Sequence, residues 1–360
     1  MRAGVVLAAV LALAPAVRDL HRALARPRPG SCRTGPPLPA VPRRKIPQPD
    51  PHPHAGAGTT LASTRAWATG RRRRRPRPGP RHPPPTTEKL TPHGLHITWY
   101  GHSTALVEIE GARILTDPVF SDRCSPAPLP GPRRLHPSPL PAAELPPLDA
   151  VVISHDHYDH PTPPPCAHSP ACRTHRSWCR SASARTFNAG TSPRPHHRTR
   201  LGQSVTVNGV RLTATEARHY SGRGLTSDKT LWASWVLTGE RRRVFYSGDS
   251  GYFPGYAGIG SAHGPFDVTL MQIGAYGDAW ADIHMTPEQA LTAHTRRPRQ
   301  PPHPPALGHL RPRPAPLGRA RRPHLARRPD HRHPTGRPQP GQRVDAAAPP
   351  EVDGWWQRLA

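Results

Sequence analysis

The feature that most constrains this chain is a ten-residue stretch, Val151–His160, which reads VVISHDHYDH. Four apolar or small residues run directly into four side chains that bind metal ions well: His155, His157, Asp159 and His160. Neutral imidazole and carboxylate are ligands that zinc-like divalent ions prefer, and a buried strand gives such a loop a rigid base. A single histidine would mean little, because the chain has 24 of them. Their order and spacing after a strand favour a metal site over a solvated polar loop.

The overall composition points instead to a disordered, basic protein that binds nucleic acid. The chain has 53 prolines, a formal net charge of +27 and only 34% hydrophobic residues. Two blocks, Thr91–His160 and Leu201–Thr295, depart from this average. The first has 4 Lys/Arg and 8 Asp/Glu and the second has 7 and 8, so the rest of the chain carries +32. Nucleic acid is therefore not the expected partner of the patterned blocks. An inactive or basic nucleic-acid-binding protein, acting through Arg71–Arg75, remains the alternative of another class.

The alternation of patterned blocks with Arg/Pro-rich segments also predicts the domain organisation. Residues 1–26 contain an apolar run, Ala3–Val17, which is short of the roughly 20 residues that span a bilayer. A signal-peptide core, an interfacial anchor and a plain helix all stay open for it, so we expect a cytoplasmic or membrane-associated protein. The later divisions follow the Arg/Pro-rich texture: a basic low-complexity arm at 27–90, a metallo-hydrolase domain at 91–350 interrupted by irregular segments at 161–200 and 296–343, and a tail at 351–360.

Alternating apolar residues and turn residues predict short strands within the two blocks. Glu110–Gly111 and Asn208–Gly209 are expected at turns between strands, and Asp117–Pro118 is expected to end one. LWASWVLTG, RRRVFYSGDSG and FDVTLMQIGAY read as further strands. Thr286–Gln289 reads TPEQ, a capping box with proline at the first helical position, which predicts a helix through about His294.

Two explanations of the alternating textures stay open. The Arg/Pro-rich segments are either disordered basic insertions or the product of translation partly out of register from a G+C-rich gene. Codons for Ala306–Gly318 admit a shifted reading, HWGTFDLAPHRW. Codons for Arg176–Phe187 admit FVVPLGVGAHL, which has the apolar run of a buried strand. An uninterrupted reading frame in the nucleotide sequence would exclude the second explanation.

Two further candidate ligands, His219 and Asp249, each follow a predicted strand and precede a glycine-containing turn. Taken alone, they would be an ordinary hydrogen-bonded histidine and a turn aspartate. Beside the cluster at 155–160 they describe a site at one edge of a β-sandwich. Weaker candidates, which contact substrate or support the ligands from behind, are Tyr158, Tyr276, His284 and His102. The strand beside His102 favours the supporting role for it.

The motifs WYGHST, ILTDPVF, VVISHDHYDH, ARHYSGRG, FYSGDSGY and HMTPEQA resemble those of the metallo-β-lactamase superfamily. More narrowly they resemble the branch of the N-acylphosphatidylethanolamine-hydrolysing phospholipase D and its bacterial relatives. The resemblance covers about His96–His160 and Leu201–His294. It implies an α/β fold, the αβ/βα four-layer sandwich, with two zinc ions at the edge of the facing sheets. It implies this ligand set: His155, His157 and His219 for one ion, Asp159 and His160 for the other, and Asp249 bridging both.

The implied activity is that of a binuclear zinc hydrolase. Two ions about 3.5–4 Å apart lower the pKa of a shared water, so that a bridging hydroxide can attack a phosphodiester. Asp159 and Asp249 are then the catalytic carboxylates, and the substrate is a phospholipid, met at a membrane surface, or a small ester. A lactonase or another phosphoesterase is the alternative, because one fold hosts many reactions. The family also supplies a histidine from an HWGTF motif, which this chain lacks as written. We therefore expect the second zinc site to be incomplete, with His303 and His309 as candidate substitutes.

Overall fold

The computed structural model describes part of the compact unit Pro51–Ala360. The described residues are 92–122, 137–157, 159–160, 201–223, 231–273, 276, 281–295 and 338–349, with strands at 176–180, 196–199, 226–227, 306–310 and 335–336. The apolar run at 3–17, the basic arm at 27–90, the tail at 351–360 and Tyr158 lie outside them. Within the described part, no helix is both long and apolar enough to cross a membrane.

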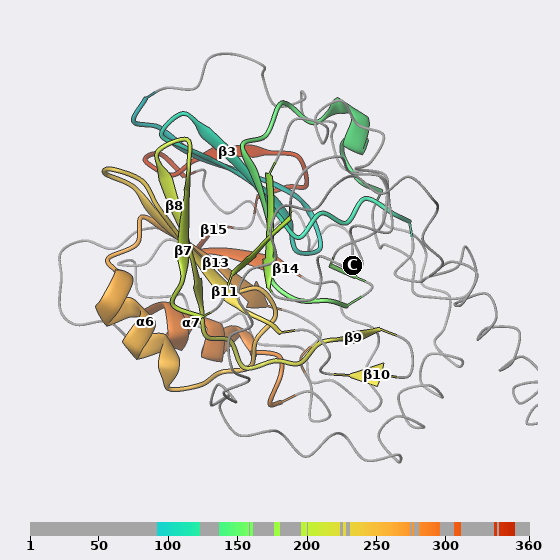
Figure 1. The fold of residues 1–360 in the computed structure, drawn as a ribbon, viewed down its shortest axis with the longest axis vertical. Coiled ribbons are helices and arrows are strands. Elements are labelled where there is room, and N and C mark those ends of the chain that lie inside the picture. Colours follow the sequence, from blue (N-terminus) through green and yellow to red (C-terminus); the bar gives the residue numbers. More distant parts are fainter. Residues whose placement is uncertain are drawn as a thin grey trace, which may run out of the picture. The chain divides into compact units, whose positions relative to one another are not determined.

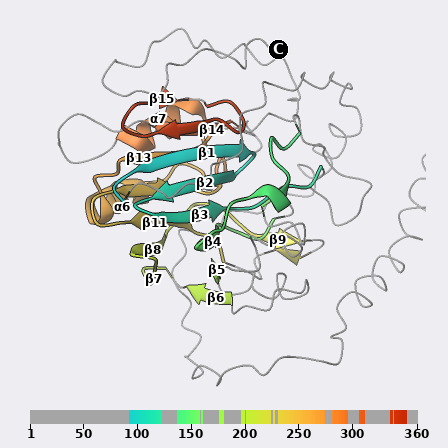
Figure 2. The same cartoon turned by 90° about the horizontal axis from the view of Figure 1, so that it is seen from above.

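The first of two seven-stranded sheets contains β4 (Ala150–Ile153), the strand that leads into the candidate metal-binding loop (Figure 2). Its strands, in spatial order, are β16 (Arg343–Asp345), β1 (Leu95–Gly101), β2 (Thr104–Ile109), β3 (Ala112–Thr116), β4 (Ala150–Ile153), β5 (Arg176–Arg180) and β6 (His196–Thr199). Pairing is antiparallel from β16 to β3 and parallel from β3 to β6.

The second sheet repeats this plan. Its strands, in spatial order, are β7 (Ser204–Val207), β8 (Val210–Thr215), β11 (Ser234–Thr238), β12 (Arg243–Tyr246), β13 (Val268–Ile273), β14 (Ala306–Leu310) and β15 (Thr335–Gly336). Pairing is antiparallel from β7 to β12 and parallel from β12 to β15. A small hairpin, β9 (Gly222–Arg223) and β10 (Thr226–Ser227), follows β8.

The main core lies between the two sheets. It contains Ile97 and Val107 from the first sheet and Trp235 and Leu270 from the second, all nearly inaccessible to solvent. The indole nitrogen of Trp235 donates a hydrogen bond across this core to the carbonyl oxygen of Ile153, at 3.1 Å. Because Ile153 is the last residue before the metal-binding loop, this bond fixes the base of the loop to the opposite sheet.

Further layers cover the outer faces of both sheets. Helices α6 (Gly255–His263) and α7 (Pro287–Thr295) pack on the second sheet, on the side away from the first (Figure 1). Figure 2 views the molecule from the side of the first sheet. Leu140, Leu145 and Leu148, around the short 3-10 helix η1 (Ala142–Glu144), cover the outer face of that sheet. The α/β sandwich is therefore confirmed, with a 3-10 helix and extended chain as its fourth layer in the described residues.

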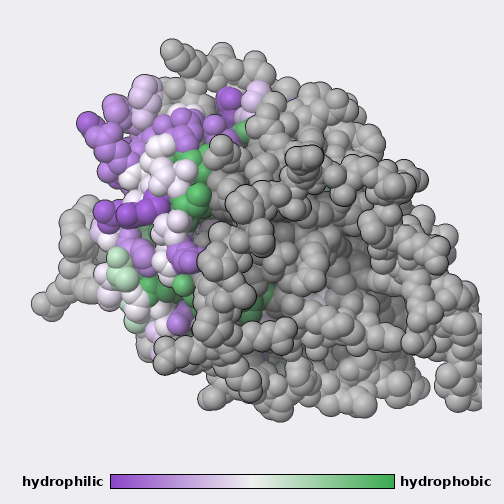
Figure 3. Space-filling view, in the orientation of Figure 1, coloured by the Kyte–Doolittle hydropathy of each residue, from purple (hydrophilic) through white to green (hydrophobic). Residues whose placement is uncertain are grey.

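The outer surface of the described part agrees with this layering. On the face shown in Figure 3, the described residues are mainly hydrophilic, and hydrophobic ones form small patches between them. The apolar residues of the described strands are mostly buried in the layers.

The local predictions are confirmed where short-range chemistry decides the structure. Asn208 and Gly209, with φ of 45° and 78°, form the turn between β7 and β8, and Glu110 and Gly111 do the same between β2 and β3. In the capping box, the Gln289 amide donates to Thr286 Oγ1 at 3.2 Å, and the Thr286 amide donates to Gln289 Oε1 at 3.0 Å. Helix α7 begins at Pro287, as predicted, and ends at Thr295.

The prediction that 161–200 and 296–343 are irregular is wrong at four strands. Strands β5 and β6 lie in the first segment, and β14 and β15 lie in the second. The reason is that each continues a parallel ladder from a block strand: Ala150 pairs with Arg176, and Thr269 pairs with Ala306. Backbone groups make these ladders, so an apolar side-chain pattern is not required for pairing. Strands β5 and β14 begin at Arg176 and Ala306, where the two shifted readings begin.

Candidate metal centre

The candidate ligands gather where several strands end. The loop after β4 carries the histidine cluster, Asp249 follows β12, and His219 follows β8. In sheets with parallel strands, sites form outside the carboxyl ends of the strands. Backbone bonds join these loops: the Gly222 amide donates to the Asp156 carbonyl oxygen at 3.0 Å, and the Gly251 amide donates to the Arg218 carbonyl oxygen at 2.8 Å. The sheet edge therefore brings both sequence blocks to one place.

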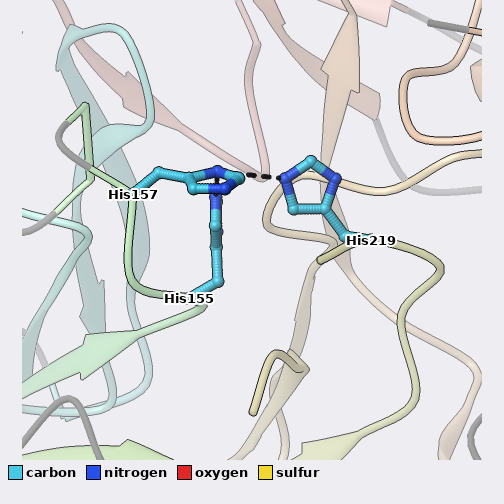
Figure 4. Close-up of side chains that lie close together, drawn as sticks. All are labelled: His155, His157 and His219. Carbon is cyan, nitrogen blue, oxygen red and sulfur yellow. Dashed lines mark hydrogen bonds between the residues drawn. The ribbon is translucent and has the colours of Figure 1, made fainter. Parts of the chain in front are cut away.

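Three imidazole rings face one another at this edge: His155, His157 and His219 (Figure 4). His155 Nε2 lies 2.8 Å from His157 Nδ1, and His219 Nε2 lies 3.4 Å from the same atom. Two ligands of one tetrahedral zinc, each about 2.0–2.1 Å from the ion, are about 3.3 Å apart. The described side chains thus have nearly the spacing of a three-histidine metal site.

The opposite ring nitrogens are held by other groups. His155 Nδ1 lies 2.9 Å from Ser154 Oγ, and His219 Nδ1 lies 3.2 Å from the carbonyl oxygen of Ile283. Metal-binding histidines are commonly oriented by such a partner on the other nitrogen. Burial lowers the pKa of both His155 and His219 well below 6.5, so both rings are neutral at pH 7. Neutral imidazole is the form that binds a metal.

His160 connects two buried carboxylates. Its Nδ1 lies 2.8 Å from Asp117 Oδ2, and its Nε2 lies 3.2 Å from Asp249 Oδ2. Burial alone would lower the pKa of His160, but the Asp249 and Asp117 carboxylates outweigh it and raise the pKa to about 10. A metal ion near Nε2 would take the place of that proton.

Asp117 is a functional residue that the sequence analysis missed, because it was treated only as the end of a strand. Its buried carboxylate accepts hydrogen bonds from the Ser154 amide at 2.7 Å, the Ser154 hydroxyl, and the Tyr246 hydroxyl at 2.5 Å. Ser154 and His160 belong to the metal-binding loop, whereas Tyr246 ends β12 in the other sheet. Asp117 therefore fixes this loop to the strand that precedes Asp249. The signal available in the sequence was an Asp-Pro pair directly after an apolar strand.

The remaining candidates fall on either side of this centre. Asp159 Oδ2 lies 3.2 Å from His102 Nε2, and these two residues share a group of potential ligand atoms with His160. His284 is buried and forms such a group with His219 and Asp249, while Gln272 Nε2 lies 2.7 Å from its Nδ1. Two other candidates are placed less closely: Tyr276 is half-buried after β13, and Tyr158 lies outside the described residues.

His303 and His309 are the candidate substitutes for the HWGTF histidine. The structure describes the side chain of neither. His303 lies outside the described residues, and only the backbone of His309 is described, paired with Gln272 between β14 and β13. The donors that are described nevertheless fit a divalent ion. They form overlapping groups of imidazole and carboxylate, each with its ligand atoms within 4.8 Å of one another. Such a donor set suits zinc and several other first-row metals.

The chain is similar to several known proteins. A family model described as "Beta-lactamase superfamily domain" matches residues 112–300. An uncharacterized protein of Mycobacterium tuberculosis is 43% identical over 268 residues, which cover 73% of this chain and 72% of that protein. The N-acyl-phosphatidylethanolamine-hydrolyzing phospholipase D 1 of Caenorhabditis elegans is 35% identical over 214 residues, 56% of this chain and 60% of that protein. A solved metallo hydrolase from the archaeon Ignicoccus hospitalis superposes with a TM-score of 0.46 at 20% identity, covering 70% of this chain and 97% of its own.

Proposed function

The chain belongs to the metallo-β-lactamase superfamily, and from this premise we propose that it is a metal-dependent hydrolase that cleaves phosphodiesters. The observation that carries the proposal is the facing arrangement of His155, His157 and His219, with the opposite ring nitrogens of His155 and His219 held by neighbouring groups. Buried neutral imidazoles whose ring nitrogens converge have little reason to do so in a purely structural core, because they leave polar atoms without water. A bound cation accounts for both their burial and their orientation.

We assign the ligands from their groupings. His155, His157 and His219 hold a first ion, Asp159 and His160 hold a second, and Asp249 lies between the two. The 3.2 Å contact of Asp249 with His160 and its grouping with His219 support the bridging position. Zinc is the proposed metal for both ions, since the donors are imidazole and carboxylate.

A divalent ion bound here would supply a Lewis acid and lower the pKa of the attacking water. The protein's own groups keep the ligands ready for it. Asp117 and Ser154 hold His160 and His155 by their Nδ1 atoms, so that Nε2 of each ring faces the centre. These imidazole rings therefore do not have to reorganise during the reaction.

Asp159 is the proposed proton acceptor in the reaction. Its side chain is 25% exposed, against 1% for Asp249 and 0% for Asp117. A carboxylate at the solvent side of the centre can accept a proton from the attacking water at its oxygen and release it to bulk solvent. Asp249 and Asp117 are too deeply buried to exchange protons in this way.

The proposed substrate class is a phospholipid-like phosphodiester, met at a membrane surface. The support for this class is the similarity to the nematode phospholipase, whose name states its substrate. The fold itself does not choose the substrate, and a lactone or another ester is the competing class.

The test uses the full chain, stripped of metal with a chelator and reloaded with zinc. Hydrolysis of an aryl phosphodiester, of N-acylphosphatidylethanolamine in vesicles and of an aliphatic lactone is compared with and without metal. We expect zinc-dependent cleavage of the phosphodiesters that is lost in His219→Asn and retained in Asp122→Asn, a change at an exposed residue. Faster lactone cleavage would favour the competing class. Salt-sensitive DNA binding with no bound metal would contradict the enzyme and favour a basic nucleic-acid-binding protein.

A further inference from the structure

The second ion of the proposed centre lacks the histidine of the HWGTF motif in this chain. Another histidine, His102, lies beside Asp159 and His160. We propose that His102 completes the second metal subsite, binding the ion through Nε2 beside Asp159 and His160. The inference rests on the proposed function, because it presupposes that a first ion is held by His155, His157 and His219.

The position of His102 in the fold places it at the sheet edge. It lies in the tight turn between β1, which ends at Gly101, and β2, which begins at Thr104. The indole nitrogen of Trp99 donates to the His102 carbonyl oxygen at 2.9 Å and so fixes the turn. The imidazole ring is 5.4 Å from that of His160, centroid to centroid, and its side chain is 18% exposed. The ring therefore stands at the mouth of the centre rather than in the core.

The distance between His102 and Asp159 fits two ligands of one ion. His102 Nε2 lies 3.2 Å from Asp159 Oδ2, and His160 Nε2 lies the same 3.2 Å from Asp249 Oδ2. Ligands of a tetrahedral zinc are about 3.3 Å apart, so the spacing of His102 Nε2 and Asp159 Oδ2 fits two ligands of one ion. By contrast, His160 Nδ1 lies 2.8 Å from Asp117, which is a hydrogen-bond distance. His160 thus contacts Asp117 through Nδ1 and Asp249 through Nε2, and its Nε2 side faces the centre.

The backbone at His102 is held in an unfavourable conformation. Its φ is 52°, in the left-handed region, which costs a residue other than glycine about 1–2 kcal/mol. Strained backbone persists where the surrounding structure enforces it, and it gathers at ligand-binding sites. Glycine would adopt this backbone conformation without strain. A histidine at this position is therefore explained by what its imidazole ring binds.

The potential ligand groups among the described residues separate the other histidines from Asp159, apart from His160. His284 lies with His219 and Asp249, on the side of the first ion. Among the described residues, the potential ligand groups place Asp159 together with His102 and His160 alone. His102 is therefore the described residue best placed to stand in for the missing histidine of the HWGTF motif.

The experiment is a cobalt titration of the full metal-free chain in competition with a chelator, which yields an affinity for each equivalent. Variants His102→Asn and His102→Gly are used, because both residues tolerate a positive φ and the turn can keep its shape. His96→Asn, in strand β1 that leads into this turn and paired with Asp345 in β16, is the matched control. We expect the parent and the control to bind two equivalents. Both His102 variants should lose at least about 100-fold in affinity for the second equivalent, beyond the roughly 10–100-fold caused by losing a group behind a ligand.

Chemical rescue separates a ligand from a supporting residue. Imidazole in solution should restore second-equivalent binding to His102→Gly, and the cobalt absorption spectrum should return with it. A smaller loss, or a loss that imidazole does not repair, would overturn the inference. So would a parent chain that binds one equivalent, lost in His219→Asn, and no second. A parent chain that binds no cobalt would instead overturn the proposed function itself.

Discussion

Neighbouring strands β4 and β5 show how differently two regions of this molecule are specified. They pair in register from Ala150 and Arg176 to Ile153 and Cys179. Strand β4 reads AVVI and all of its residues are buried, whereas β5 reads RSWCR. The first sequence predicts a buried strand and the second does not. Parallel backbone pairing connects them.

The same contrast recurs in the second sheet. It also separates the strands that precede the candidate ligands from those that do not. Strand β13 reads VTLMQI, and its parallel neighbour β14 reads ALGHL. The proposed ligands that the structure describes follow strands of the first kind: β1, β4, β8 and β12. The histidine that the family resemblance implies, and that this chain lacks, would come from the segment of β14. The proposed centre is therefore built on the well-patterned strands, and the ligand it lacks would come from a segment without that pattern.

The largest effect is expected at Asp117, where the patterned strands of both sheets meet. Asp117→Ala removes the buried acceptor that Ser154, Tyr246 and His160 share. Breaking a buried charge network costs about 3–5 kcal/mol. Urea unfolding of the metal-free chain should show this loss in free energy of unfolding. Asp122→Ala, at an exposed residue of the same loop, should change it by less than about 0.5 kcal/mol. Equal effects of the two changes would contradict the network.

Acid should destabilise the patterned region next most strongly. The pKa of His155 and His219 is lowered well below 6.5 by burial, so below about pH 6.5 the unfolded chain binds protons that the folded chain does not. The metal-free chain should then lose up to about 1.4 kcal/mol per group for each pH unit. His160, with a pKa of about 10, is protonated in both states in this window and adds no slope; its contribution is lost as pH rises from about 6.5 to 10.

Urea unfolding at pH 7, 6 and 5 in the presence of a chelator measures this slope. The double variant His155→Gln, His219→Gln should flatten it, since glutamine does not titrate. A parent chain equally stable at pH 7 and pH 5 would show that these two rings are not buried together as described.

Amide hydrogen exchange compares the two kinds of strand directly. Amides of β4 should exchange at the rate of global unfolding, because they lie in the main core. Amides of β5 and β14 should exchange at least about 30-fold faster, since little apolar sequence holds those strands in place. Replacing Arg176–Phe187 and Ala306–Gly318 by their shifted readings should bring the rates together. Equal protection of β4 and β5 in the chain as written would remove the contrast.

The smallest effect is expected at the end of the sandwich away from the metal centre. The Glu110 carboxylate, in the β2–β3 turn, accepts hydrogen bonds from the Arg241 and Arg242 amides at 2.7 Å, in the β11–β12 turn. Glu110→Gln weakens these charge-assisted bonds and should cost about 1 kcal/mol, reduced by partial exposure. Metal affinity should not change. A lowered metal affinity in this variant would mean that the far turn, and not only the ligand loops, positions the centre.

The sequence predicted those parts of the fold and site that short-range chemistry decides. The turn at Asn208–Gly209 and the capping box at Thr286 need only neighbouring residues, and both are confirmed. Asp117 was missed because its partner Tyr246 lies 129 positions away, beyond the reach of any local pattern. The strands β5 and β14 were missed because their own sequences lack a strand pattern, while their backbones pair with the neighbouring strands β4 and β13.

The central claim is that two sequence blocks meet at one metal ion, and a double-mutant cycle of metal affinity tests it most directly. His157 comes from the first block and His219 from the second, with 3.4 Å between their facing nitrogens. We predict that His157→Asn and His219→Asn each abolish binding of the same cobalt equivalent, and that the double variant loses little more than either single one. Losses that add independently, or single variants that lose different equivalents, would contradict the claim.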